Sequence, residues 1–126
     1  MSPMAFAAVG IGAALGAWLR WALSTWFNPA VPSLPMGTLT ANLVGGYLVG
    51  IAVAYFAAST SMAPEWRLFC ITGFLGGLTT FSTFSAESVQ LLMGAQYGAA
   101  LLHTAAHLVG SVAATFLGFV TYRIVA

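Results

Sequence analysis

The chain has 126 residues, of which 60% are hydrophobic and only 4% are charged, and its formal net charge is +1. A typical soluble domain has about 25% charged residues, so lipid rather than water must be the main solvent of this chain. The charges are too few for a basic surface that binds nucleic acid, and a lone Cys excludes an internal disulfide.

Four apolar segments are long enough to cross a membrane, which requires about 20 apolar residues. They run from about residue 4 to 27, 37 to 58, 66 to 93 and 97 to 125. No positive residue precedes the first segment, so it is read as a retained helix and not as a signal peptide. The strand alternation of a membrane barrel is missing. One all-α domain of four transmembrane helices, covering residues 1–126, is therefore predicted.

Short polar connectors separate these segments. Three prolines between residues 28 and 35 forbid a continued helix and predict an extended connector. Residues 57–64 form a short polar turn, and Pro64 suits the first turn of the next helix. Residues 94–96 make the last connection.

The positive charges leave the orientation in the membrane undecided. With four spans, Arg67 and Arg123 lie on one side and Arg20 lies toward the other. A difference of two against one does not set the topology by the positive-inside rule. The chain is thus predicted to insert in both orientations, which would allow an antiparallel homodimer with its two-fold axis in the membrane plane.

The first two segments contain pairs of small residues and one amide side chain. Gly12 and Gly16, like Gly46 and Gly50, are four residues apart and predict close helix packing. Asn42 must find hydrogen-bond partners at membrane depth. It either bonds to a neighbouring helix or turns its amide donors toward the path of an anion, and the residue alone leaves both alternatives open.

The third segment contains the most informative stretch, GFLGGLTTFSTFS at residues 73–85. Its three glycines precede five hydroxyl residues and two phenylalanines. Residues 67–79 would form about 20 Å of helix, which is shorter than a hydrocarbon core of about 30 Å. A break between residues 76 and 85 would therefore lie inside the membrane. Such backbone is tolerated where it is buried in protein or lines a polar cavity, so a broken helix that builds an ion site is predicted.

The two phenylalanines of this stretch suit an anion site. Phe81 and Phe84 are three residues apart and can share a face of a helix. The edge of an aromatic ring is positive, so it can attract an anion while excluding water. The alternative is that the rings pack a core and the hydroxyls bond back to their own helix. The neighbouring glycines favour the ion site.

The fourth segment contains a polar stripe that is expected to face the interior of the bundle. Its members are spaced four residues apart: His103, His107, Ser111 and Thr115. Two histidines at this spacing can bind a metal, but no acidic residue stands near them in the segment. Haem would need axial ligands from facing helices. A hydrogen-bonding lining of a polar pathway is the favoured interpretation.

Three motifs stand out along the chain. The most specific is GFLGGLTTFSTFSAE at residues 73–87, the second is GTLTANLVG at residues 37–45, and the third is the glycine pattern with GAWLRW in residues 10–21. Together they resemble the Fluc (CrcB) family of fluoride ion channels. The resemblance covers nearly the whole chain in length, number of spans and order of motifs. It implies passive, selective export of cytoplasmic fluoride across the bacterial inner membrane, which lowers fluoride toxicity.

The resemblance also implies an assembly and a set of site residues. The assembly would be an antiparallel homodimer in the lipid bilayer, with two fluoride pores and one structural Na⁺ on the axis. The Na⁺ would be held by the backbone carbonyls of Gly76 and Thr79 from both copies. The pore residues implied are Asn42, Phe81, Phe84, Ser82, Thr83, His107 and Ser111. Arg20 and Glu87 would lie toward pore entrances or subunit contacts, and contact of His103 or His107 with the ion stays open.

Two other kinds of membrane protein fit some of these features. A small multidrug transporter has a similar length and four spans, but it relies on a carboxylate in its first helix, and the first segment here has none. A membrane anchor or assembly subunit would leave the polar cluster of the third segment unexplained. An enzyme is not expected, because no nucleophile, base and orienting group stand at a catalytic spacing.

Overall fold

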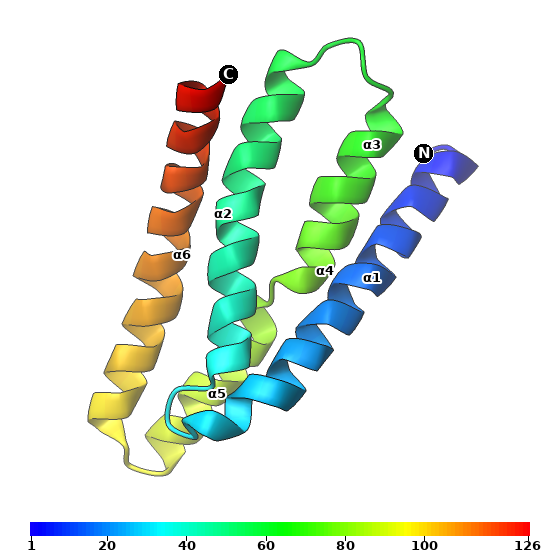
Figure 1. Ribbon diagram of the computed structural model, residues 1–126. Coiled ribbons are helices and arrows are strands. Elements are labelled where there is room, and N and C mark those ends of the chain that lie inside the picture. Colours follow the sequence, from blue (N-terminus) through cyan, green and yellow to red (C-terminus); the bar gives the residue numbers. More distant parts are fainter.

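The computed structural model describes residues 1–126 and consists of helices and short connectors (Figure 1). Four stretches are long and apolar enough to cross a membrane: Pro3–Ala30, Met36–Ala58, Pro64–Met93 and Tyr97–Val125. The prediction of an all-α protein with four membrane-spanning helices is therefore confirmed. The two termini lie at the same end of the bundle, as an even number of spans requires (Figure 1).

Three of the four spans are single long helices. They are α1 (Pro3–Phe27), α2 (Met36–Ala58) and α6 (Tyr97–Val125). Ser2 begins α1 as an N-cap, since its side chain accepts a hydrogen bond from the Ala5 N–H at 3.0 Å. The predicted start and end of the fourth span agree with α6, and those of the first two spans differ from α1 and α2 by one residue at most.

The third span is divided into four pieces. It comprises α3 (Pro64–Arg67), the π-helical segment η2 (Leu68–Leu75), α4 (Gly76–Leu78) and α5 (Phe81–Met93). Pro64 occupies the first helical position, where its missing N–H is not needed. A π-helical stretch this long is rare, and such widened turns are frequent at functional sites.

The first connector differs from the expected extended chain. Its first three residues form a short 3₁₀ helix, η1 (Asn28–Ala30), because the fixed φ angle of Pro29 is compatible with a helical turn. The Asn28 side chain then holds the start of α2. Its amide donates to the Thr38 hydroxyl at 3.2 Å and accepts the Thr38 N–H at 3.0 Å.

Glycines bring the helix backbones into contact. A Cβ added to Gly73 of η2 would lie 3.0 Å from the Cα of Gly12 on α1, and one added to Gly50 of α2 would lie 3.0 Å from the Cα of Gly118 on α6. A distance of 3.0 Å is tighter than nine in ten real Cβ contacts, and the Thr115 carbonyl would lie closer still to a Cβ on Gly50. Both predicted small-residue faces are thus used for packing, α1 against the third span and α2 against α6.

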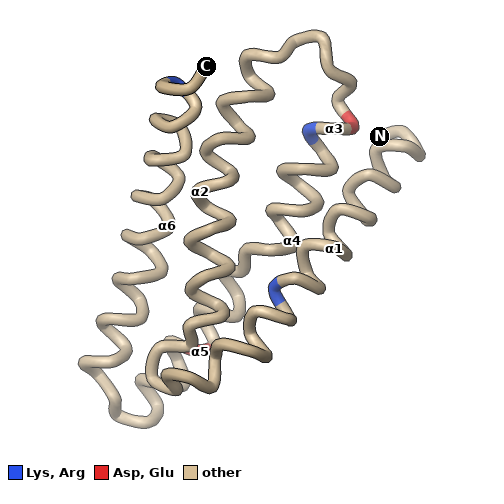
Figure 2. The backbone as a smooth tube through the Cα atoms, viewed as in Figure 1, with Lys and Arg blue, Asp and Glu red and all other residues tan.

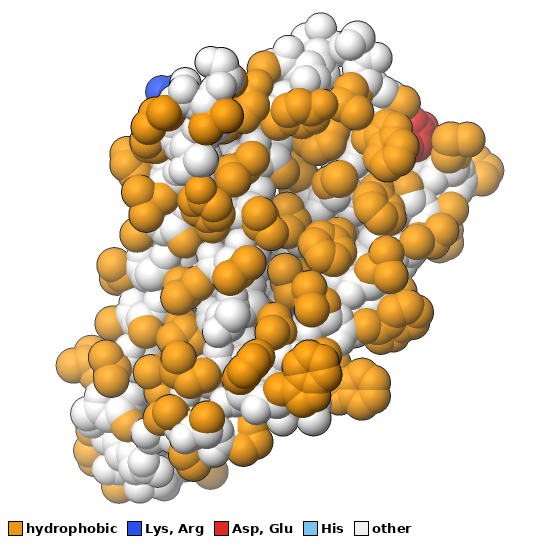
Figure 3. All heavy atoms as spheres, in the orientation of Figure 1, with side chains coloured by type: hydrophobic (Ala, Val, Ile, Leu, Met, Phe, Trp, Pro, Cys, Tyr) orange, Lys and Arg blue, Asp and Glu red, His pale blue; other side chains and the backbone are white.

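The outer surface of the bundle is apolar. Hydrophobic side chains spread over the whole face seen in Figure 3, and charged residues are few along the chain (Figure 2). The buried hydrophobic cluster is correspondingly small and contains Ala41, Leu75 and Leu78. Lipid tails are as apolar as a protein core, so a membrane bundle needs backbone packing and polar contacts more than a large core.

Candidate functional site

The third span is interrupted at two residues near its middle. Thr79 (φ −85°, ψ 154°) and Thr80 (φ −149°, ψ 120°) have extended backbone between α4 and α5. Neighbouring residues of the same span supply hydrogen-bond partners for part of the backbone at this interruption. The Thr79 N–H and hydroxyl both donate to the Leu75 carbonyl, at 3.0 and 2.9 Å, and the Thr80 hydroxyl accepts the Thr83 N–H at 3.1 Å as an N-cap of α5.

Asn42 on α2 supplies the remaining hydrogen bonds of Thr80. Its Oδ1 accepts the Thr80 N–H at 2.7 Å, and its Nδ2 donates to the Thr80 carbonyl at 2.9 Å. In a continuous helix that N–H would donate to the carbonyl of Gly76. The Asn42 amide therefore acts as the partner of an extended residue on the neighbouring span.

The second Asn42 amide hydrogen also has a partner inside the protomer. Nδ2 lies 2.9 Å from Nδ1 of His107 on α6, and since an amide nitrogen only donates, the imidazole accepts there. Of the two alternatives left open for Asn42, the structure shows the interhelical one: this side chain joins α2, the interrupted span and α6. Reaching an ion would require it to give up one of these bonds.

Removal of this side chain should destabilise the bundle. Asn42→Ala leaves the N–H and carbonyl of Thr80 without partners, and an unpaired buried group costs about 1–3 kcal/mol, so the free energy of unfolding should fall by about 2 kcal/mol or more. Thr25→Ala is the matched control, because that hydroxyl bonds only to the Trp21 carbonyl of its own helix. Thermal unfolding in detergent measures both. Equal stability of the two variants would contradict the bridging role.

Aromatic and imidazole rings gather next to the interruption. The Phe81 and Phe84 rings meet edge to face, with centroids 5.3 Å apart and planes at 77°. Phe84 is buried and stacks on His107 at 4.8 Å and on His103 at 5.5 Å. Phe81 is 73% exposed on the protomer surface. Phe84 is thus held by α6, whereas Phe81 has an open side.

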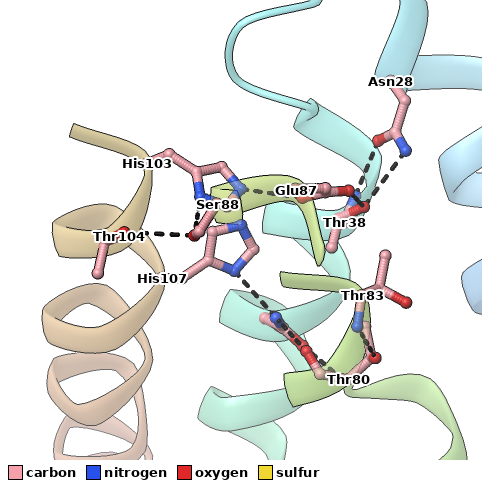
Figure 4. A network of polar contacts seen from close by, with 10 residues as sticks. Asn28, Thr38, Thr80, Thr83, Glu87, Ser88, His103, Thr104 and His107 are labelled. Atoms are coloured by element: carbon pink, nitrogen blue, oxygen red, sulfur yellow. Dashed lines mark hydrogen bonds and ion pairs between the residues drawn. The ribbon is translucent and has the colours of Figure 1, made fainter. Parts of the chain in front are cut away.

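A second polar network joins α2, α5 and α6 around Glu87 and His103 (Figure 4). Nε2 of the fully buried His103 lies 2.9 Å from Oε1 of Glu87, and the Thr38 hydroxyl donates to Oε2 at 2.7 Å. The Ser88 hydroxyl lies 2.9 Å from Nδ1 of His103. Each of these contacts links different helices, so the Glu87 carboxylate is satisfied within one protomer.

Sequence reasoning assigned no role to Thr38 or Ser88. A signal was present for Thr38, which lies four residues before Asn42 and therefore on the same face of α2. Ser88 follows Glu87 directly and gave no signal of its own.

A cavity of about 300 Å³ opens beside the interruption. Five of the predicted pore residues line it: Asn42, Phe81, Phe84, His107 and Ser111. The other lining residues are Gly46, Val49, Thr79, Thr80, Leu108 and Val112. The structure does not bring Ser82 and Thr83 into this cavity. Ser82 is exposed, and its hydroxyl lies 3.3 Å from that of Thr80.

The carbonyls at the end of α4 have lost their usual helical partners. The N–H groups four residues after Gly76 and Thr79 donate instead to Asn42 and to the Thr80 hydroxyl. The carbonyl of Gly77 accepts from Nε of Arg20 on α1 at 3.0 Å. Arg20 therefore contacts the helical turn just before the interruption, and a cation at the C-terminal end of a helix is favourable.

These features define a multi-pass helical membrane protein with a polar site at the interruption of one span. The chain belongs to the CrcB family, since the model of the family described as CrcB-like protein, Camphor Resistance (CrcB), matches residues 7–119. The resemblance inferred from the motifs is thus confirmed.

Individual relatives match over nearly their full length. The chain is 59% identical over 126 residues to "Fluoride-specific ion channel FluC" of Cupriavidus pinatubonensis, covering 100% of each chain. It is 58% identical to the protein of that name from Cupriavidus metallidurans, again over 100% of each. The protein of that name from Nitrosospira multiformis is 55% identical over 123 residues, which are 98% of this chain and 96% of the relative. The chain is therefore a multi-pass bacterial membrane protein of a channel family and not an enzyme.

Proposed function

We propose that this chain is a fluoride-selective channel that lets fluoride leave the cytoplasm passively. The observation that carries the proposal is the cavity beside the interrupted span, which is lined by two phenylalanine rings together with hydrogen-bonding groups of α2 and α6. Fluoride is small and strongly hydrated, so a pore must replace its water with donors and positive ring edges. The name of the relatives, fluoride-specific ion channel, agrees with this chemistry.

The ring of His107 lines this cavity and carries an unpaired donor on the side that faces His103 and Ser88. Its Nδ1 accepts from Asn42, so the single proton of the neutral ring is on Nε2. Nε2 is buried and has no hydrogen-bond partner. An unpaired buried donor costs about 1–3 kcal/mol, and an anion would remove that cost. Ser111, one turn further along α6, adds a hydroxyl to the same cavity.

The working unit in this proposal is an antiparallel homodimer with two pores. Support comes from the exposed side of Phe81 and from Ser82, which is exposed on the same stretch. A partner copy packed there would cover these side chains and bring Ser82 and Thr83 to a polar track shared with Phe81. Arg20 and Glu87 would then lie toward the pore entrances or the subunit contacts.

A structural Na⁺ on the two-fold axis completes this assembly. The carbonyls of Gly76 and Thr79 are candidates because the usual helical donors of both point elsewhere. Four such oxygens, two from each copy, suit a hard cation of low charge. The nearest carboxylate along the chain, Glu87, is engaged by Thr38 and His103. A crystal structure grown in Na⁺ without density between these carbonyls would refute the cation site.

Ion efflux from liposomes tests the function. Vesicles containing the purified protein and loaded with potassium fluoride or potassium chloride are diluted into salt-free buffer with valinomycin, and ion-selective electrodes record the efflux. Fluoride should leave rapidly, whereas chloride should be retained as it is in protein-free vesicles. Equal efflux of the two anions, or no fluoride efflux from a verified dimer, would overturn the proposal.

A further inference from the structure

Three side chains of types that bind metals lie close together beside the second polar network. Glu87, His103 and His107 each offer a ligand atom, and these atoms lie within 4.8 Å of one another. The expectation that the two histidines lack an acidic partner is wrong. Glu87 is sixteen residues away from His103 in the chain, but the turn between α5 and α6 folds it back against α6.

We propose that Glu87, His103 and His107 form a binding site for a divalent transition metal ion of the Zn²⁺ type. Two imidazoles and one carboxylate form the ligand set of zinc sites that keep a fourth position open for water. Nitrogen ligands favour such metals over Ca²⁺ and Mg²⁺, which prefer oxygen. The carboxylate also offsets half of the charge of the ion, which matters at this depth in the membrane.

The orientation of His107 is an independent observation that points to a ligand. The ring is 2% exposed, and its Nε2 has no partner. In Figure 4 the nitrogen that Asn42 leaves free points toward Ser88 and His103. The centroids of the two imidazole rings are 4.6 Å apart. An unpartnered nitrogen thus faces the other two ligands across a short gap.

The surroundings of His103 are ready for coordination through Nε2. A metal would replace the proton between Nε2 and Glu87, and the ring would carry its proton on Nδ1. That N–H would donate to the Ser88 hydroxyl, which already lies 2.9 Å away. A partner of this kind fixes the tautomer and orientation of a ligating histidine.

Coordination by His107 would act on the cavity. With a metal on Nε2, the ring proton moves to Nδ1. The Asn42 amide already donates a hydrogen to Nδ1, so two hydrogens would point at each other. The contact between Asn42 and His107 must therefore open. In the proposed channel, a bound metal would occupy the unpaired donor of His107 and open its contact with Asn42 beside the cavity, so it should also block fluoride efflux. This consequence rests on the proposed function, but binding itself does not.

The test measures metal binding by the purified, tag-free, full-length chain in detergent, without fluoride. Titration with Co²⁺ should give the visible absorption of a four- or five-coordinate site at one ion per chain, and Zn²⁺ should displace it. Glu87→Gln, His103→Gln and His107→Gln should each weaken binding about tenfold or more. Cys70→Ser and Glu65→Gln are the controls and should bind like the wild type. The chain has no other histidine or cysteine that would obscure the result.

The outcomes separate this proposal from the channel function. Absence of Co²⁺ absorption in the unmodified chain overturns the metal site, and so does binding that survives both histidine substitutions or is lost in Cys70→Ser. Size-exclusion profiles identify variants that fail to fold. If the variants do not fold, the titration of the wild-type chain still shows whether the metal site exists. Metal binding without fluoride efflux would keep the site and refute the channel, while efflux with no metal binding would do the reverse.

Discussion

Phe84→Ile and Phe81→Ile should each reduce fluoride efflux from liposomes about tenfold or more, because loss of about 1.4 kcal/mol of favourable ring contact at the barrier slows passage tenfold. Isoleucine keeps apolar volume but has no positive ring edge to offer an anion. It also lacks the flat face with which Phe84 stacks on His103 and His107. The two positions should differ in stability. The buried Phe84 supports α6, whereas Phe81 is mostly exposed on the protomer.

The control is Phe6→Ile, which changes an exposed ring of α1 far from the cavity. It should leave the efflux rate within twofold of the wild type. Thermal unfolding in detergent separates a loss of flux from a loss of folded protein. If Phe81→Ile and Phe84→Ile both conduct like Phe6→Ile, the rings serve packing alone and the anion role of their edges is refuted.

Forcing the chain into one orientation should abolish fluoride efflux. The C-terminus of α6 lies on the same side as the α2–α3 connector, where Arg67 and Arg123 give a weak positive bias. Three Lys added after Ala126 should hold this side in the cytoplasm. An antiparallel dimer needs both orientations, so this variant expressed alone should give vesicles as tight as protein-free ones.

Rescue by the opposite variant is the matched control. Three Lys inserted after Pro32 add positive charge on the other side of the membrane. This variant should also be inactive when it is expressed alone. Co-expression of the two variants supplies one copy of each orientation and should restore efflux. Accessibility of a terminal tag in intact cells verifies the orientations. Full activity of a singly oriented variant would refute the antiparallel dimer.

The architecture was largely predictable because transfer into lipid depends on local composition. A stretch such as 97–125 is long and apolar enough to enter lipid whatever its neighbours are, because insertion depends on the transfer free energies of its own residues. The third span was harder. Its glycines and hydroxyl residues indicated an interruption between residues 76 and 85, but the two extended residues, Thr79 and Thr80, lie where Asn42 can pair with them.

The candidate site was predictable in its residue types and less so in its contacts. Asn42, Phe84 and His107 do line one cavity. Asn42 donates its two amide hydrogens to Thr80 and His107, which lie 38 and 65 residues further along the chain. No periodicity within one helix reports such a pairing.

The sequence by itself determined that this protein lives in a membrane, that it crosses four times and that its polar groups gather on the second, third and fourth spans. Only the tertiary structure decided which of these groups meet. Glu87 contacts Thr38 and His103 because the packing of α2, α5 and α6 brings these three side chains within hydrogen-bond distance. Partition into lipid is a sum over single residues, whereas a hydrogen bond requires two groups within about 3 Å, and only packing sets that distance.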